Sequence, residues 1–212
     1  MFKKLAAVLL FAAAVLAAGT ATAATAAAGA ENKYAEGRDY EIRSETRSAT
    51  PEIREFFSFF CGHCFQMRES FEKVAGRLSK KAKFVPHPVE MIGGDMGRAS
   101  VTGYLIAKNH GVEDLYTKEL FDQLHVGGKY PEDLEFFTDL LRSLGLSTGQ
   151  IKRDYRSFPI QGQLSAYNRM VLDLKIDAVP ELVVNGKYLL KMDNIDTEQQ
   201  LYDALNYLLD LP

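Results

Sequence analysis

The chain has 212 residues, of which 47% are hydrophobic and 25% are charged, and its formal net charge is −3. This composition is typical of a globular protein and excludes disordered, collagen-like and coiled-coil chains. The sequence has no run rich in lysine and arginine, so we expect no binding to nucleic acid. Two cysteines cannot staple a small scaffold, and the core must therefore be held by burial of apolar side chains.

Residues 1–30 have the pattern of a secretory signal peptide. Lys3 and Lys4 precede Leu5–Ala18, an apolar run shorter than the roughly 20 residues that a membrane-spanning helix needs. The small residues that follow offer cleavage sites after Ala23, Ala26 or Ala30. A short N-terminal anchor is the alternative interpretation. We expect a soluble, exported mature protein in a compartment that permits disulfides.

The next part of the chain predicts strands around one amphipathic helix. Asp39–Ser44 alternates weakly and Ile53–Phe60 is rich in aromatic residues, which predicts a first strand and a buried second strand. A helical face follows directly, formed by Met67, Phe71, Val74 and Leu78. Lys83–Glu90 predicts a third strand, which Pro86 and Pro88 place at a sheet edge or in a bulge.

The middle of the chain has helical periodicity. Three helices are predicted, over Arg98–Asn109, Glu113–His125 and Pro131–Leu144. Ser147 and Gln150 have the spacing of a capping box and predict the start of a fourth helix. Pro159 is expected to end that helix, and a further helix is expected over about Gly162–Leu174.

Strand signals return near the end. Two apolar runs flank Asn185-Gly186, a strong indication of a tight hairpin. A second capping box, formed by Thr197 and Gln200, predicts a terminal helix. This element order indicates an α/β fold with a mixed sheet and a helical insertion. We therefore expect residues 31–91 and 164–212 to form one domain and residues 92–163 to form the insertion.

The segment Cys61-Gly62-His63-Cys64 is the expected chemical centre, because two thiols at this spacing can close and reopen a disulfide. The helix N-terminus stabilises an anion, so we expect Cys61 to be the exposed nucleophile. Cys64, one turn inward, is expected to be the resolving thiol. A charged or hydrogen-bonding His63 would stabilise the Cys61 thiolate further.

Two plainer interpretations of the cysteine pair are an inert disulfide and half of a metal site. An inert bridge across so short a loop gives little entropic benefit. The sequence has no second cysteine pair, and His87, His110 and His125 show no ligand spacing. We expect these three histidines to be packed or on the surface. We also expect no bound metal and no other cofactor.

Two further positions bear on this chemistry. The Val179–Pro180 bond enters an apolar run, and the residues alone allow it to be trans or cis. Glu55 precedes Cys61 in the aromatic strand, where burial of its carboxyl would raise the pKa. Such an acid could exchange a proton with Cys64. The alternative is that Glu55 lies on an outward face or at a strand end.

Together these features resemble the DsbA family of periplasmic thiol–disulfide oxidoreductases. The resemblance covers essentially the whole mature chain and rests on four segments: Glu55–Cys64, Gly93–Gly97, Gly111–Asp114 and Val179–Tyr188. It implies a thioredoxin fold with an inserted all-helical domain. It also implies a periplasmic, monomeric thiol:disulfide oxidase that introduces disulfide bonds into exported proteins.

The resemblance implies specific roles as well. Cys61 would attack and form the mixed disulfide, and Cys64 would be the buried cysteine. Pro180 would be a cis-proline facing the disulfide, and with Val179 it would help to bind an extended substrate chain. Glu55 would be a buried acid. The implied partners are reduced or unfolded exported proteins and DsbB, the quinone-linked membrane protein that reoxidises the site.

Three departures from the family pattern leave other functions open. The usual dipeptide between the cysteines is Pro-His, whereas Gly62-His63 matches that of eukaryotic protein disulfide isomerase. A periplasmic reductase or isomerase is therefore the main alternative, followed by a non-enzymatic thiol or metal binder. Arg68 lies where close relatives often carry an acid and could lower the pKa of Cys61, and the chain has no tryptophan.

Overall fold

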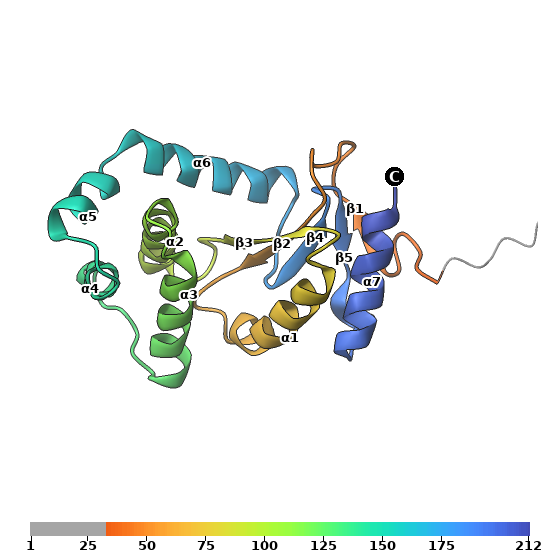
Figure 1. The fold of residues 1–212 in the computed structure, drawn as a ribbon, viewed down its shortest axis with the longest axis horizontal. Coiled ribbons are helices and arrows are strands. Elements are labelled where there is room, and N and C mark those ends of the chain that lie inside the picture. Colours follow the sequence, from red (N-terminus) through yellow and green to blue (C-terminus); the bar gives the residue numbers. More distant parts are fainter. Residues whose placement is uncertain (1–32) are drawn as a thin grey trace, which may run out of the picture. The chain divides into compact units, whose positions relative to one another are not determined.

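The structure, a computed structural model, describes residues 33–212, so the predicted signal peptide and its cleavage sites lie outside the described residues. In chain order the elements are β1 (Tyr40–Ile42), β2 (Glu52–Phe57), α1 (Gly62–Leu78), β3 (Lys83–Pro88), α2 (Gly94–Asn109), α3 (Glu113–Phe121), a π-helical turn η1 (Asp122–Val126), α4 (Glu135–Ser143), α5 (Thr148–Tyr155), α6 (Phe158–Asp173), β4 (Glu181–Val184), β5 (Tyr188–Leu190), a 3₁₀ turn η2 (Met192–Asn194) and α7 (Glu198–Asp210) (Figure 1). None of the helices within this range is long and apolar enough to cross a membrane.

The five strands form one mixed sheet in the order β1-β5-β4-β2-β3. β2 and β3 are parallel, and the other neighbouring strands are antiparallel. β3 is an edge strand, which confirms the position that Pro86 and Pro88 predicted. A proline has no backbone N–H to donate, so it fits best in a strand that has a neighbour on one side only. The register places Glu55 of β2 between Pro86 and Leu182.

The local turn and cap signals are confirmed. Asn185 and Gly186 have φ values of 54° and 64°, the left-handed conformation that a type I′ hairpin needs at both positions. The two predicted capping boxes are both formed, by Ser147 with Gln150 and by Thr197 with Gln200. Each begins a helix at the predicted residue because side-chain oxygens satisfy N–H groups that lack partners in the first turn.

Helices cover both faces of the sheet (Figure 1). α1 and α7 pack on one face through a shared apolar cluster that includes Phe71 and Leu205. On the other face, Phe56 and Val183 pack with Leu174, at the end of α6.

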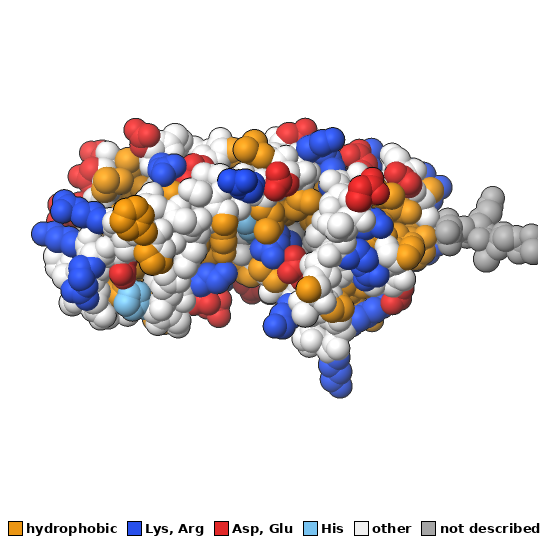
Figure 2. Space-filling view, turned by 90° about the horizontal axis from the view of Figure 1, so that it is seen from above, with side chains coloured by type: hydrophobic (Ala, Val, Ile, Leu, Met, Phe, Trp, Pro, Cys, Tyr) orange, Lys and Arg blue, Asp and Glu red, His pale blue; other side chains and the backbone are white. Residues whose placement is uncertain are grey.

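The helical segment α2–α6 surrounds a separate apolar cluster, with Tyr104, Tyr116 and Phe137 fully buried in it. The same cluster contains Cys61 and Cys64, so the cysteines lie where this segment meets the sheet. On the surface of the molecule, charged side chains of both signs lie among apolar ones, as Figure 2 shows for one face.

Several predicted boundaries were wrong by a few residues. β2 ends at Phe57 rather than at Phe60. The helix predicted over Pro131–Leu144 is α4, which begins at Glu135, where Asp133 Oδ1 accepts the backbone N–H of Glu135 at 2.9 Å. α3 ends at Phe121 and continues as the π-helical turn.

Pro159 lies in the first turn of α6 rather than at the end of a helix. The N–H groups of a first turn have no intrahelical acceptor, so a proline loses no hydrogen bond there. α6 begins at Phe158. It runs unbroken across residues 163 and 164, where we expected the helical insertion to end. Residues 33–212 form one compact unit, and the division into two domains stays a prediction.

Candidate active site

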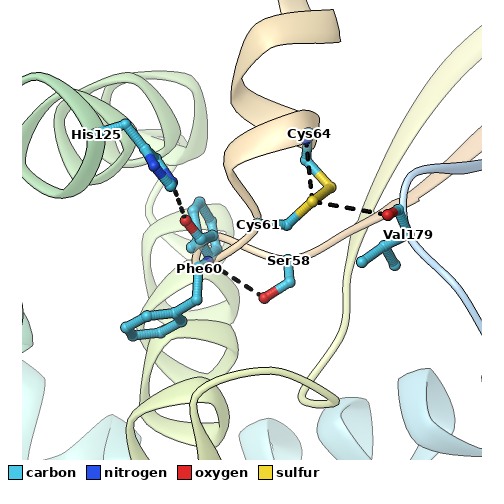
Figure 3. The surroundings of a disulfide bond; sticks show 7 residues. Ser58, Phe60, Cys61, Cys64, His125 and Val179 are labelled. Atoms are coloured by element: carbon cyan, nitrogen blue, oxygen red, sulfur yellow. Dashed lines mark hydrogen bonds between the residues drawn. A yellow bond between two sulfur atoms is a disulfide. The ribbon is translucent and has the colours of Figure 1, made fainter.

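A tight turn carries the chain from the end of β2 into α1. The backbone N–H of Phe60 donates to Ser58 Oγ at 3.2 Å (Figure 3), and that of Cys61 donates to the Ser58 carbonyl oxygen at 3.1 Å. Ser58 is fully buried, so these bonds also satisfy polar atoms that water cannot reach. The turn therefore fixes Cys61 at the start of the helix.

Cys61 is the N-cap residue of α1, with extended backbone angles of φ −92° and ψ 110°. Its Sγ accepts the backbone N–H of Cys64 at 3.0 Å, and the two cysteines form a disulfide. This is the place where a helix offers unpaired N–H groups and partial positive charge. After reduction, the same N–H group would stabilise a thiolate at Cys61.

The prediction that Cys61 is exposed was wrong. The side chain of Cys61 packs in the cluster beneath α2–α6, and Cys61 is only 8% exposed, compared with 1% for Cys64. Cys61 is still the more accessible of the two. Part of its cover comes from Val179, whose carbonyl oxygen lies 3.7 Å from Cys61 Sγ (Figure 3). Sγ carries no hydrogen in the disulfide, so this is a contact rather than a hydrogen bond.

The Val179–Pro180 peptide bond is cis, the isomer that the resemblance implied. The bond precedes β4, and Val179 packs against both the cluster that holds the cysteines and the cluster beneath α6. The structure thus brings together three sequence-predicted residues, Cys61, Cys64 and Val179.

Gly62 and His63 occupy the exposed side of the first turn of α1. A Cβ added at Gly62 would meet no atom within 4 Å, so packing does not require glycine there. His63 faces solvent, and its effect on the thiolate stays a prediction.

Glu55 is buried, which excludes the alternative of an outward-facing side chain. Burial raises the pKa of its carboxyl to about 8, while the charge of Arg68 opposes this rise and that of Glu72 adds to it. Glu55 lines a cavity together with these two residues of α1. Arg68 is one helical turn beyond Cys64, so the cavity runs along the helix that carries the cysteines.

Sequence reasoning missed His125 as part of this region. Its Nε2–H donates to the carbonyl oxygen of Phe59 at 2.7 Å (Figure 3), and its ring stacks on Phe65 at a centroid distance of 5.1 Å. It therefore braces the turn before Cys61 from η1. No spacing pattern could have revealed this contact, because His125 and Phe59 are 66 positions apart.

Within residues 33–212, no group of three or more metal-ligating side chains is arranged to hold an ion. His87 and His125 are packed, and Nε2 of the exposed His110 lies 2.7 Å from Asp154 Oδ2.

Comparisons with known proteins agree with this geometry. A family model described as DSBA-like thioredoxin domain matches residues 52–203. The thiol:disulfide interchange protein DsbA of Escherichia coli K12 is 28% identical over 185 residues, which cover 83% of this chain and 88% of that protein. The protein of the same name from Pectobacterium carotovorum is 27% identical over 188 residues, covering 84% and 89%.

Solved structures show the same fold. The DsbA of Klebsiella pneumoniae has a TM-score of 0.73 and 22% identity, covering 85% of this chain and all of that one. A cysteine-to-serine variant of Proteus mirabilis DsbA, in complex with a cysteine-containing peptide, has a TM-score of 0.72 and 26% identity, covering 84% and 99%. The α/β thioredoxin fold and the resemblance predicted from the sequence are thus confirmed.

Proposed function

Because the chain belongs to the family of DSBA-like thioredoxin domain proteins, we propose that it is a thiol:disulfide oxidase that introduces disulfide bonds into exported proteins. The observation that carries the proposal is the position of Cys61, disulfide-bonded at a helix N-terminus with its Sγ accepting the N–H of Cys64. An anion is stabilised there. A stabilised thiolate favours the reduced protein and therefore makes its disulfide a stronger oxidant.

The reaction transfers two electrons in two exchange steps. A substrate thiolate attacks Sγ of Cys61, which forms a mixed disulfide and releases the sulfur of Cys64 as a thiolate. A second substrate thiolate then attacks the substrate sulfur of that mixed disulfide and releases the thiolate of Cys61. The substrate leaves with a disulfide, and the protein is left with two reduced cysteines.

Glu55 would exchange the proton of Cys64. With a pKa of about 8 its carboxyl holds a proton at neutral pH and can give it to a departing thiolate. Val179 and Pro180 would bind the extended substrate beside Cys61, since the Val179 carbonyl oxygen lies against Sγ. His63 would favour the Cys61 thiolate from the exposed side of the turn.

The partners and location follow from the family. We expect reduced or unfolded exported proteins as substrates, a DsbB-like quinone-linked membrane protein as the reoxidant, a periplasmic location and a monomer. The peptide complex of the Proteus mirabilis protein supports binding of a cysteine-containing chain. Sedimentation of the mature protein at twice the monomer mass would contradict the monomer.

The deciding experiment is the reduction potential of the Cys61–Cys64 pair, from equilibration with glutathione and thiol trapping. Known proteins of this fold span from about −270 mV for thioredoxin to about −120 mV for DsbA. A value near the oxidising end supports the oxidase. A value near the reducing end would instead favour the reductase or isomerase that Gly62-His63 suggests.

Two variants test the roles of the cysteines. We expect Cys61→Ser to abolish disulfide transfer to a reduced model protein and Cys64→Ser to accumulate mixed disulfides at Cys61. Retained turnover in Cys61→Ser would exclude the proposed reaction. Unchanged behaviour after alkylation of Cys61 would point to a non-enzymatic binder.

A further inference from the structure

A cavity of about 440 Å³ opens beside β2 and β3, next to α1, α2 and α3. Its deep part is formed by buried side chains, and its mouth by the partly or largely exposed Arg68, Glu72 and Asp114. This volume lies within the range of pockets that bind small organic molecules.

The deep part of the cavity contains a carboxyl without a partner. Glu55 is 7% exposed, and within residues 33–212 no hydrogen bond or ion pair reaches its side chain. Its strand neighbours are Pro86 and Leu182, which offer no side-chain donor. The Glu55 carboxyl lines the cavity without a protein donor, so a ligand that brings N–H groups can reach it and would gain hydrogen bonds there.

Aromatic rings form much of the cavity wall, and such rings attract cations. Phe57, Tyr104 and Phe121 are almost fully buried and line the cavity with Phe84. The guanidinium of Arg68 already lies 5.9 Å from the centroid of the Phe121 ring, so this wall accepts a positive group.

The charges around the cavity also favour a cation. Among the described residues, Arg68 is the one basic residue that lines the cavity, and its Nε is paired with Glu72 Oε1 at 2.8 Å. That pair leaves Glu55 and Asp114 as the remaining charged or chargeable groups. An anion would therefore meet the charge of Asp114 at the mouth and find no unpaired basic group among the described lining residues.

We propose that this cavity binds a small organic primary amine, whose ammonium group donates hydrogen bonds to Glu55 while its apolar part packs against the aromatic wall. Asp114, at the mouth, adds a second negative group to the entrance. The proposal rests on the cavity itself, and it holds whether or not Glu55 takes part in disulfide exchange.

Three probes of nearly equal size and different charge test the site. Benzylamine, benzyl alcohol and benzoate are titrated into the oxidised full protein at neutral pH, and binding is followed by NMR shifts. We expect saturable binding of benzylamine, at least about tenfold tighter than that of benzyl alcohol, because only the ammonium gains the cation–π contacts and the attraction of Asp114, and because it brings three N–H donors to Glu55, whose proton it displaces on binding. Equal affinity for the amine and the alcohol, tighter binding of benzoate, or no saturable binding would each overturn the proposal.

Matched variants locate the site. Glu55→Gln and Asp114→Asn should each weaken benzylamine binding severalfold while the circular dichroism spectrum stays unchanged. Glu69→Gln is the control, because it makes the same substitution at an exposed position of α1 that does not line the cavity. Wild-type affinity in Glu55→Gln, or equal losses in Glu69→Gln, would contradict the assignment. The readout involves no thiol exchange, so it is independent of the oxidase test.

Discussion

The ring of His87 lies flat against the ring of Tyr167, with centroids 4.0 Å apart and planes 17° apart. The stack joins the edge strand β3 to α6. Nη1 of Arg54 lies 3.4 Å from Nδ1 of His87, and Nε2 of His87 lies 3.2 Å from the carbonyl oxygen of Tyr167. Because a guanidinium can only donate, Nδ1 accepts and Nε2–H donates. The imidazole is therefore neutral.

This neutral histidine should make the fold sensitive to acid. Burial, together with the charges of Arg54 and Lys108, lowers the pKa of His87 from 6.5 to about 3. The unfolded chain thus binds a proton more readily, and stability is present above about pH 6.5 and lost as the pH falls toward 3. Between pH 6.5 and 4, wild type should lose on the order of 3 kcal/mol more unfolding free energy than His87→Phe.

Urea denaturation at several pH values measures this difference. His87→Phe retains an aromatic ring beside Tyr167 but cannot titrate. His110→Gln is the control, since this exposed histidine is paired with Asp154 outside the sheet. Parallel curves for wild type and His87→Phe would show that His87 does not control the acid response.

The parts of the fold that sequence could predict depend on local signals. Asn185-Gly186 specifies its own turn, and Ser147 with Gln150 specifies the start of a helix within four residues. The cysteine pair is equally local, because its spacing and its place after an aromatic strand suffice to indicate redox chemistry.

The parts that sequence could not predict depend on distant contacts. Cys61 is buried partly by Val179, which is 118 positions away, so its exposure could not be judged from its position at a helix start. Arg68 and Glu72 are a local pair within one helix, but their position beside Glu55 depends on how α1 packs over β2. Tertiary packing decides such features.

Replacing the glycine between the cysteines should be tolerated. Gly62 is the first residue of α1, where proline has a suitable φ and no intrahelical hydrogen bond to lose, and a side chain there would meet nothing within 4 Å. We expect Gly62→Pro to raise the unfolding free energy of the oxidised protein by about 0.5–1 kcal/mol. Urea denaturation checks this, with Gly62→Ala as the control. A loss of more than about 1 kcal/mol would mean that the turn needs the glycine.

Glu55 should destabilise the fold at alkaline pH. Its pKa of about 8 lies above the value of 4.5 for an exposed glutamate. The contribution of Glu55 to the free energy of unfolding is therefore fully present below pH 4.5 and is lost as the pH rises through 8. Glu55→Gln should therefore gain a few kcal/mol of stability relative to wild type between pH 5 and pH 9. Denaturation at these two pH values measures the change. An equal pH response in both proteins would contradict the buried, protonated acid.

The brace from His125 to Phe59 should order the turn that carries Cys61. His125→Phe keeps an aromatic ring against Phe65 but leaves the Phe59 carbonyl oxygen without its donor. A buried acceptor without a partner costs about 1–3 kcal/mol, so the variant should be less stable by about that amount. Hydrogen exchange should also quicken at the Cys61 amide, which is bonded to Ser58 within the same turn. Faster exchange throughout the chain, rather than at this turn, would show that the loss is global and that His125 does not brace the site.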